Sequence, residues 1–123
     1  MRNETPGKGG FTLVEITIVV AIIGMLAGIA IPNYLRCRKI AQQTTCIQNL
    51  HVIDGAVQQW AMECRKDPGE PVQYADIRIY LRHSVSCPSG GTGFDDSYQV
   101  VGVDAQPVCL RVPAGEFAHR LPL

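Results

Sequence analysis

The sequence predicts an α+β protein in which one long N-terminal helix packs on a small C-terminal domain with a short antiparallel β-hairpin or sheet. Three features of the 123-residue chain indicate this architecture. An apolar run comes first, an apolar stripe at helical spacing follows it to about residue 66, and two short β-branched runs lie near the C terminus. The expected organisation is a leader over residues 1–10, a membrane helix over 11–35, an amphipathic continuation over 36–66 and a globular domain over 67–123.

Residues 11–35 form an apolar segment that contains one acid and no base. At a rise of 1.5 Å per residue the segment makes a helix about 37 Å long, enough to cross a hydrocarbon core of about 30 Å. We therefore expect the first half of the long helix to span a membrane. The flanking bases leave its orientation open, because two precede the segment and three follow it directly.

Glu15 is the single acid of this segment. An ionised carboxylate among lipid tails costs about 3 kcal/mol on insertion scales unless a partner neutralises it. The residue therefore predicts a partner for its charge. The alternative is that Glu15 lies near the lipid headgroups at the start of the segment and stays hydrated.

Gly24 and Pro32 are the other notable residues of the apolar segment. Gly24 and Gly28 have the G-x-x-x-G spacing, which can let two membrane helices approach closely. Because glycine is common in membrane helices, mere tolerance of the residue is an equal alternative. Pro32 removes one backbone hydrogen bond and clashes with the preceding turn, so we expect the helix to kink or loosen between Gly24 and Pro32.

An apolar stripe at steps of four and three extends the helix beyond the membrane segment. Its members are Cys46, Leu50, Ile53, Val57, Trp60 and Cys64, with Ile47 and Ala61 beside them. Before the Asp67-Pro68-Gly69 sequence only Gly55 could interrupt a helix. We therefore predict one continuous helix from residue 11 to about residue 66. A long soluble coiled coil is disfavoured, because the stripe covers only two to three heptads.

The remainder of the chain predicts short elements. Residues 74–81 fit a short helix or a strand, and the helix is favoured. Residues 86–96 are rich in Gly, Ser and Asp and predict a loop. Residues 98–103 and 108–112 predict a hairpin that needs the long helix beneath it, because two strands alone are only marginally stable. The tail is expected to lie across this sheet or to fray.

Five cysteines suggest an oxidising compartment. On a straight helix Cys37 and Cys46 are about 13 Å apart and Cys46 and Cys64 about 27 Å, whereas a disulfide needs Cα atoms within about 7 Å. We therefore expect the disulfide between Cys87 and Cys109, which would contribute about 3 kcal/mol by closing a loop of about twenty residues. Cys46 and Cys64 are then expected to be small buried apolar residues, and Cys37 is left over.

No residue pattern indicates catalysis, a cofactor or nucleic-acid binding. Bases and acids balance at eleven each, so no excess of positive charge argues for a nucleic-acid partner. The three histidines are scattered, and neither Cys-x-x-Cys nor His-Glu-x-x-His occurs. Asp95, Asp96 and Asp104 could hold calcium, but acids at turn ends are favoured because the ordered Asp-x-Asp-x-Asp-Gly spacing is missing. We predict no catalytic residues, no enzyme, no cofactor and no metal site.

The start of the chain resembles the prepilin signature of type IV pilins and type II secretion pseudopilins. The matching residues are Lys8, Gly9, Gly10, Phe11, Thr12, Leu13, Val14 and Glu15, continued by Gly24, Pro32, Asn33 and Tyr34. The resemblance implies a pilin-like fold, cleavage after Gly10 by a membrane aspartic peptidase on the cytoplasmic face, and N-methylation of Phe11. It also implies that the leader lies inside and the globular part outside the cytoplasm.

By the same resemblance the chain is expected to be a structural subunit of a type IV pilus or a type II secretion pseudopilus, drawn into a helical fibre by its N-terminal helix. The implied partners are further copies of the chain, other pilins or pseudopilins, the prepilin peptidase and N-methyltransferase, an inner-membrane assembly platform and membrane lipid. The implied location is the bacterial inner membrane as a single-pass protein, and after assembly a periplasmic or extracellular fibre.

This reading also supplies a partner for Glu15. Cleavage frees a cationic amine on Phe11, and in a fibre the carboxylate of one subunit can meet the amine of its neighbour, which would fix the register of assembly. A plain membrane-anchored or secreted binding domain that does not polymerise is the alternative, and it has no use for Glu15 or for the Gly10-Phe11 junction. Pilus or pseudopilus, and major or minor subunit, stay open.

Overall fold

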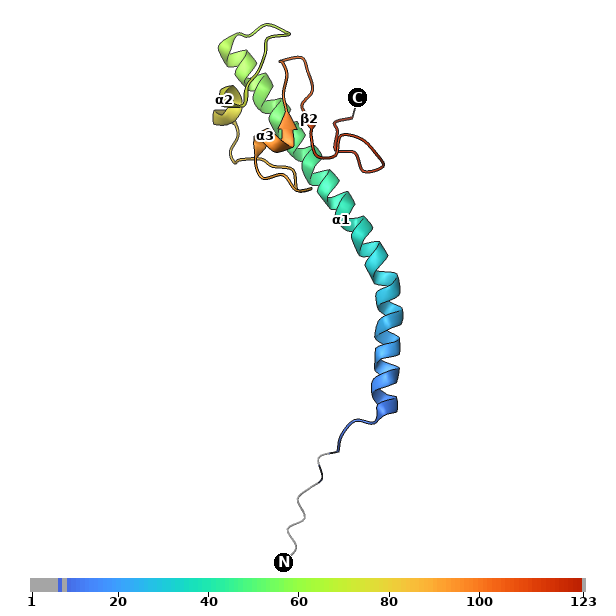
Figure 1. The fold of residues 1–123 in the computed structure, drawn as a ribbon. Helices are drawn as coiled ribbons and strands as arrows, with labels where there is room; N and C mark the ends of the chain where they lie inside the picture. The colour runs from blue at the N-terminus through green and yellow to red at the C-terminus, as the bar shows by residue number, and fades with distance from the viewer. Residues whose placement is uncertain (1–6, 8, 123) are drawn as a thin grey trace, which may run out of the picture. The chain divides into compact units, whose positions relative to one another are not determined.

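The computed structural model describes residue 7 and residues 9–122, and the chain divides into two compact units, Met1–Arg36 and Cys37–Leu123. The predicted leader over residues 1–10 falls largely outside the described residues, which do not include residues 1–6 and 8. The described elements, labelled in Figure 1, are α1 (Leu13–Cys64), α2 (Tyr74–Ile77), the 3₁₀ helix η1 (Arg78–Tyr80), α3 (Phe94–Ser97), β1 (Tyr98–Gln99) and β2 (Val108–Cys109). A long helix followed by short helices and a two-stranded sheet confirms the α+β class.

Helix α1 has 52 residues and begins two residues later than predicted, at Leu13. Thr12 precedes it as an N-cap, which places Phe11 outside the helix. Helical structure continues without a break through Pro32, and the kink or loosening expected between Gly24 and Pro32 stays a prediction. Among the described residues, α1 is the one helix long and apolar enough to cross a membrane.

The C-terminal end of α1 also differs from the prediction, by two residues. Arg65 has a φ of 50°, in the left-handed region, and directly follows the last helical residue, Cys64. The Lys66 N–H then donates to the carbonyl of Ala61 at 2.8 Å, the bond that closes a Schellman motif. The helix therefore stops before the loop that contains Pro68 and Gly69, although neither of these residues ends it.

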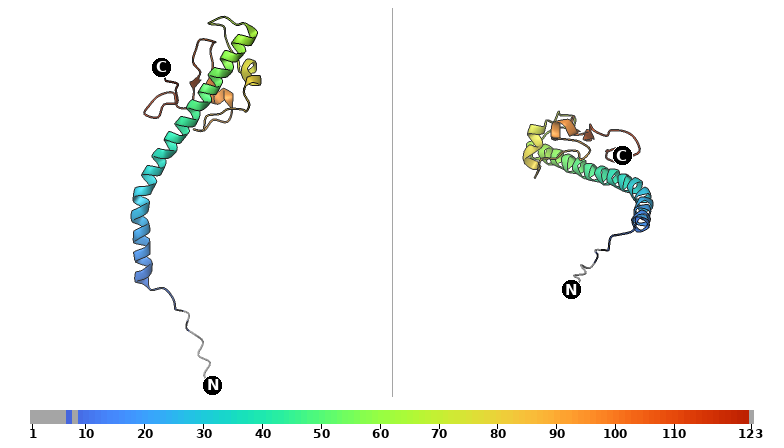
Figure 2. Two further views of the ribbon diagram at one scale, coloured as in Figure 1. Left: turned by 180° about the vertical axis from the view of Figure 1, so that it is seen from behind. Right: turned by 60° about the horizontal axis from the view of Figure 1, so that its bottom comes forward.

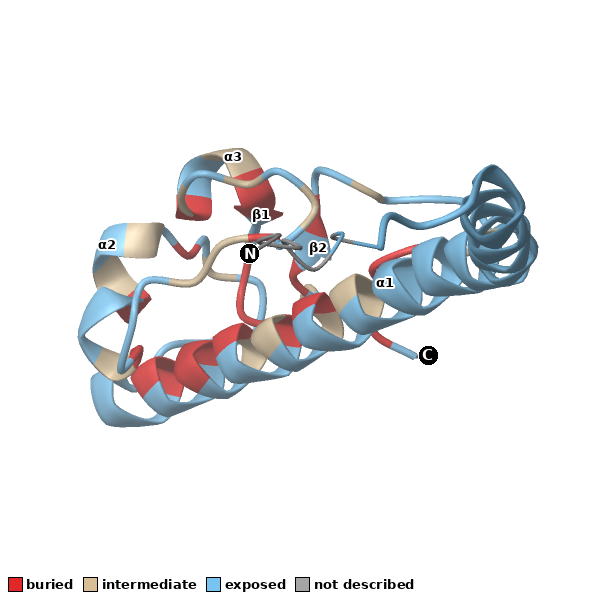
Figure 3. Ribbon diagram, turned by 90° about the horizontal axis from the view of Figure 1, so that it is seen from below, coloured by how far each residue is buried: buried red, intermediate tan, exposed pale blue. Residues whose placement is uncertain are grey.

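The core of the second unit lies on the predicted stripe of α1. Figures 2 and 3 show the short elements on one side of this half of the helix, with the buried residues facing them. The buried residues of the helix are Cys46, Leu50, Ile53, Ala56, Val57, Trp60 and Ala61. Cys64 was expected to be buried and is exposed, because it is the last helical residue and the chain turns away immediately after it.

The predicted hairpin forms, but each strand has only two residues. Tyr98 pairs with Cys109 and Gln99 with Val108 in an antiparallel sheet. The first strand was expected to extend to residue 103. Beyond Gln99 the chain instead bonds to a different segment: the Val72 N–H donates to the Val101 carbonyl, and the Val103 N–H to the Glu70 carbonyl.

Gly102 allows that change of partner. It forms an isolated antiparallel bridge with Pro71, and a Cβ atom added to Gly102 would lie 3.1 Å from the Glu70 carbonyl oxygen. A side chain at this position would crowd the neighbouring backbone. The sheet is therefore short because the residues that follow β1 form hydrogen bonds with residues 70–72 and do not continue the pairing with β2.

The predictions for residues 74–81 and 86–96 have mixed outcomes. A short helix over residues 74–81 is confirmed by α2 and η1, whose Ile77 is fully buried. The loop predicted for residues 86–96 is wrong at its end, because α3 begins at Phe94. Aromatic packing explains why a helix forms at the end of the predicted loop. The Phe94 ring stacks on the Tyr74 ring with centroids 4.3 Å apart and lies 5.9 Å from the Tyr98 ring, and these contacts stabilise α3.

The tail packs against the core instead of fraying. Ala118, His119 and Leu121 are buried. The His119 N–H donates to the Val112 carbonyl at 2.8 Å, and the Gln43 side chain of α1 donates to the Ala118 carbonyl at 2.9 Å. These bonds fix the position of the His119 ring within the second unit.

Candidate functional site

The first candidate site is the processing junction at the start of α1. Gly10 and Phe11 precede the helix and are exposed, and the Phe11 side chain is 84% exposed. The junction is therefore accessible and lies outside any helix or strand, which suits the substrate of a peptidase. Its cleavage and methylation stay predictions.

Glu15 makes a local contact that sequence analysis missed. The Thr12 N–H donates to the Glu15 carboxylate at 3.2 Å, and the Glu15 N–H donates to the Thr12 hydroxyl at 3.3 Å. Thr-x-x-Glu is a capping box, in which the two side chains satisfy free backbone donors at a helix start. The spacing is visible in the sequence and could have predicted that the helix begins after Thr12.

The rest of the first unit presents an apolar surface. Its large apolar side chains, from Phe11 through Leu35, are about half exposed or more, and the two glycines of the G-x-x-x-G spacing have open space around them. A Cβ atom at Gly24 or at Gly28 would meet nothing within 4 Å in the single chain. So large an exposed apolar surface requires lipid or other helices as its environment. The roles of Gly24 and Pro32 in assembly stay predictions.

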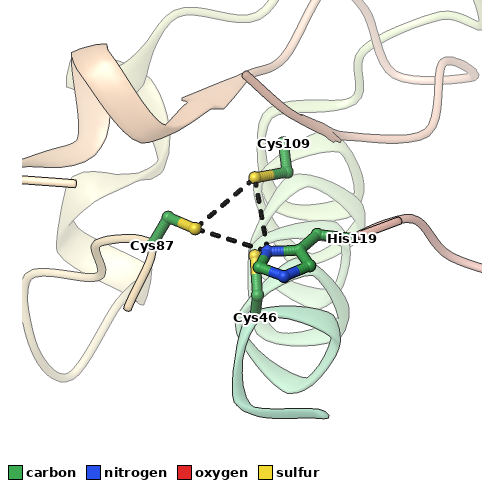
Figure 4. A group of neighbouring side chains, drawn as sticks. All are labelled: Cys46, Cys87, Cys109 and His119. Atoms are coloured by element: carbon green, nitrogen blue, oxygen red, sulfur yellow. Dashed lines mark hydrogen bonds between the residues drawn. The ribbon is translucent and has the colours of Figure 1, made fainter. Parts of the chain in front are cut away.

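The second candidate site is a buried cluster of three thiols and one imidazole, which Figure 4 shows pointing toward a common centre. Its members are Cys46, Cys87, Cys109 and His119, and their ligand atoms all lie within 4.8 Å of one another. The Cys87 Sγ atom lies 3.4 Å from His119 Nδ1 and 3.6 Å from Cys109 Sγ, and Cys109 Sγ lies 3.8 Å from Nδ1. We name this group the Cys3His cluster.

Four separate segments supply the cluster. Cys46 comes from the buried stripe of α1, and Cys109 from β2, where it pairs with Tyr98. Cys87 lies in a turn closed by the Gly91 N–H, which donates to the Cys87 carbonyl at 2.8 Å. His119 comes from the bonded tail. Because these segments are far apart along the chain, no local spacing could have predicted the group.

Burial favours the uncharged forms of three members of the cluster, Cys46, Cys87 and His119. Burial raises the pKa of the Cys46 thiol and the pKa of the Cys87 thiol, and it lowers the pKa of the His119 imidazole. Both effects favour the uncharged forms near neutral pH. The expected Cys87–Cys109 disulfide is not formed in this structure, in which both residues are thiols, and the pairing stays a prediction.

The acidic candidates have a structural explanation. Asp96 accepts hydrogen bonds from the backbone N–H groups of Thr92 and Gly93 and from the Thr92 hydroxyl, and its carboxylate lies 2.6 Å from the Arg111 guanidinium. This carboxylate caps the start of α3, which agrees with acids placed at turn ends. Asp95 and Asp104 are exposed. The observed partners of Asp96 give no support to a calcium site.

Asp96 should make the stability of the second unit depend on pH. Hydrogen bonds from Thr92 and Gly93, together with Arg111, hold the pKa of the Asp96 carboxyl well below its usual range. A carboxyl with a lowered pKa in the folded state stabilises above its unfolded pKa of about 3.9, and this contribution is lost as the pH falls below that value. We expect wild type to be more stable than Asp96→Asn at about pH 6 and the difference to shrink near pH 3.

Urea denaturation of both proteins at the two pH values measures this difference. Asn keeps an oxygen that can cap the helix but has no charge, so the comparison isolates the carboxylate. A difference that is equal at both pH values would show that the charge of Asp96 does not stabilise the fold.

Comparison with known proteins places the N terminus in a defined class. Residues 6–31 match the family model of the prokaryotic N-terminal methylation motif. This match confirms the resemblance to type IV pilins and type II secretion pseudopilins that the prepilin signature indicated.

Individual relatives belong to both branches of that class. The chain is 48% identical over 48 residues to the type IV major pilin protein PilA of Myxococcus xanthus, covering 39% of this chain and 22% of that protein. It is 26% identical over 113 residues to the type II secretion system core protein G of Klebsiella pneumoniae, covering 92% of this chain and 65% of that protein. It is 57% identical over 44 residues to the type IV wide pilus major component PilA4 of Thermus thermophilus, covering 36% of this chain and 30% of that protein.

Each of these matches covers only part of the related protein. The chain spans less than two thirds of the length of each of these three relatives. No solved structure matches the chain. The family-model match covers residues 6–31, whereas the Cys3His cluster lies in the second unit.

Proposed function

We propose that the chain is a structural subunit of a type IV pilus or a type II secretion pseudopilus, inserted in the bacterial inner membrane as a single-pass protein and incorporated into a helical fibre. The observation that carries this proposal is the apolar, exposed first part of α1, joined to a methylation motif over residues 6–31. A helix with this surface serves equally in lipid before assembly and against neighbouring helices afterwards. Contacts between neighbouring copies through this helix would be head-to-tail, and a head-to-tail interface that does not close into a ring makes filaments.

Processing is the first step of the proposed function. The leader over residues 1–10 would be removed after Gly10 by a prepilin peptidase, and the new amine at Phe11 would be methylated. Removal of the leader leaves Phe11 and Thr12 ahead of α1, so the new terminus lies within one turn of Glu15. The globular unit would remain outside the cytoplasm, and an inner-membrane assembly platform would draw the subunit into the fibre.

Assembly would use the charge of Glu15. The Glu15 side chain is exposed in the single chain and sits at the positive end of the α1 dipole. In a fibre it would pair with the Phe11 amine of a neighbouring copy or of another pilin. The pair would neutralise two charges that are otherwise costly in an apolar environment, and it would penalise every register that leaves one of them unpaired.

We expect the mature protein to begin at Phe11 with one added methyl group. Intact-mass spectrometry of the protein extracted from membranes tests this directly. Loss of the ten-residue leader with one methyl group added supports the proposed function. A mature start near residue 31 would indicate a conventional signal peptide and would contradict the pilin assignment.

A further inference from the structure

We propose that the Cys3His cluster is a structural zinc site, with Cys46, Cys87 and Cys109 as thiolate ligands and His119 as an imidazole ligand through Nδ1. All four residues are buried, and each offers one ligand atom to a common centre (Figure 4). Three thiolates and one imidazole are a donor set that tetrahedral zinc uses in structural sites. Four protein ligands leave no open position for a substrate, so the site would hold the fold together and would not catalyse a reaction.

The distances between the ligand atoms fit a tetrahedron around zinc. With Zn–S distances of about 2.3 Å and a Zn–N distance of about 2.0 Å, the edges should be about 3.8 Å between sulfurs and about 3.5 Å between sulfur and nitrogen. The observed edges are 3.6 Å for Cys87 to Cys109, 3.4 Å for Cys87 to His119 and 3.8 Å for Cys109 to His119. The Cys46 sulfur lies at most 4.8 Å from the other three ligand atoms, so a small inward movement would complete the tetrahedron.

The groups around the ligands are arranged to stabilise thiolates. The Asn49 side chain donates to the Tyr98 hydroxyl at 3.0 Å, and the Cys46 thiol donates to the same hydroxyl at 3.6 Å. Once Cys46 has lost its proton to a metal, the Tyr98 hydroxyl would donate to the sulfur in return. Such second contacts orient metal ligands and strengthen their binding.

The turn that carries Cys87 is built for a close approach of backbone to ligand. In the sequence Cys87-Pro88-Ser89-Gly90-Gly91, Gly90 has a φ of 99°, and a Cβ atom at Gly91 would clash with the Ser97 side chain and with the Cys87 backbone. Glycine at both positions lets the chain fold back over Cys87, where the Gly91 N–H donates to the Cys87 carbonyl at 2.8 Å.

A disulfide would engage only two of the four residues of the cluster. Bonding Cys87 to Cys109 removes both thiol protons, and a disulfide sulfur is at best a weak acceptor, so Nδ1 of the buried His119 would lose two of its polar neighbours. Zinc would instead engage all four residues. Binding would release the three thiol protons, leave a site of net charge minus one, and tie α1, β2 and the tail together in a unit whose strands have only two residues each.

Metal analysis of the mature full chain in detergent, purified without chelator and under reducing conditions, tests the site. We expect one zinc per chain, and Co²⁺ replacing it should give the intense visible bands of a tetrahedral thiolate complex. Cys46→Ser and His119→Gln should lose stoichiometric zinc, whereas Cys64→Ser, which changes an exposed thiol outside the cluster, should keep it. Tyr98→Phe should weaken zinc binding about 10-fold to 100-fold, because it removes a second contact.

His119→Cys distinguishes the loss of a zinc ligand from a simple folding defect. It supplies a fourth thiolate, so zinc binding should return in this variant although it is absent in His119→Gln. Chain that carries no zinc and has Cys87 bonded to Cys109 after purification without reductant would overturn the proposal. So would equal zinc content in wild type, Cys46→Ser and His119→Gln. The site does not depend on fibre assembly, so failure of either proposal leaves the other standing.

Discussion

Glu15→Ala is expected to leave membrane insertion and cleavage intact and to abolish incorporation into fibres. Removing one charge makes the membrane segment more apolar, so insertion should not suffer. In the fibre, however, the Phe11 amine of the neighbouring subunit would be buried without its counter-charge. Breaking a buried ion pair by removing one partner costs about 3 to 5 kcal/mol, and this cost would recur at every subunit added.

The capping role of Glu15 makes a matched pair of controls necessary. Because Glu15 also accepts from the Thr12 N–H, alanine removes a helix cap as well as a charge. Glu15→Gln keeps an oxygen for the cap but has no charge, so it should fail in assembly as alanine does. Thr12→Ala weakens the cap but keeps the carboxylate, so it should assemble.

The measurement is the ratio of fibre-incorporated to membrane-resident protein in the four proteins, with processing confirmed in each by mass. An unchanged ratio in Glu15→Ala would show that the carboxylate is not needed for assembly. Assembly of Glu15→Gln with failure of Thr12→Ala would assign the role of Glu15 to its own helix. Wild-type chain that is found only in membranes and never in fibres would favour the alternative of an anchored domain that does not polymerise.

The long helix could be predicted from the sequence because its signals are local and repeated. Apolar side chains in the membrane segment need no partner within the chain to identify them, and the stripe from Cys46 to Trp60 has the helical period. Errors at its ends have local causes: the capping box at Thr12 was overlooked, and Arg65 adopts a left-handed conformation that only a glycine or asparagine would have indicated.

The second unit was less predictable because tertiary contacts decide its structure. Phe94 lies in a stretch rich in Gly, Ser and Asp, and its helix depends on stacking against Tyr74, twenty residues earlier. Strand β1 ends early because the chain finds a second partner at Val72. Neither contact leaves a periodic signal in the sequence.

The Cys3His cluster shows the same limit for a site. Cys46 was expected to be an inert buried residue, and Cys87 and Cys109 were expected to pair with each other, because spacing alone cannot show that the tail returns to α1. Two local features pointed toward the site without completing it. Cys87-Pro88 is followed by two glycines within four residues, and Cys46 lies on the buried stripe at the position nearest the membrane segment.

Gly91→Ala is expected to destabilise the second unit and to weaken the zinc site in one step. The new Cβ atom would clash with the Ser97 side chain and would lie 2.7 Å from the Cys87 nitrogen and 2.9 Å from the Cys87 carbonyl oxygen. The Ser97 side chain is fully buried and has little room to move away. The other two atoms belong to the Cys87 backbone, so the turn that carries Cys87 must shift. Overpacking of this kind costs about 1 to 3 kcal/mol of unfolding free energy, and it would displace a proposed zinc ligand.

Gly93→Ala is the matched control, because it makes the same substitution two residues later. Its Cβ atom would meet nothing within 4 Å, and Gly93 has an extended backbone with a φ of −160°, which alanine tolerates. Urea denaturation followed by the fluorescence of Trp60, the only tryptophan of the chain, reports the stability of both variants. Equal stability of Gly91→Ala and Gly93→Ala would show that the turn over Cys87 can widen without cost. A destabilised Gly91→Ala that still binds zinc as tightly as Gly93→Ala would show that this turn does not position the Cys87 ligand.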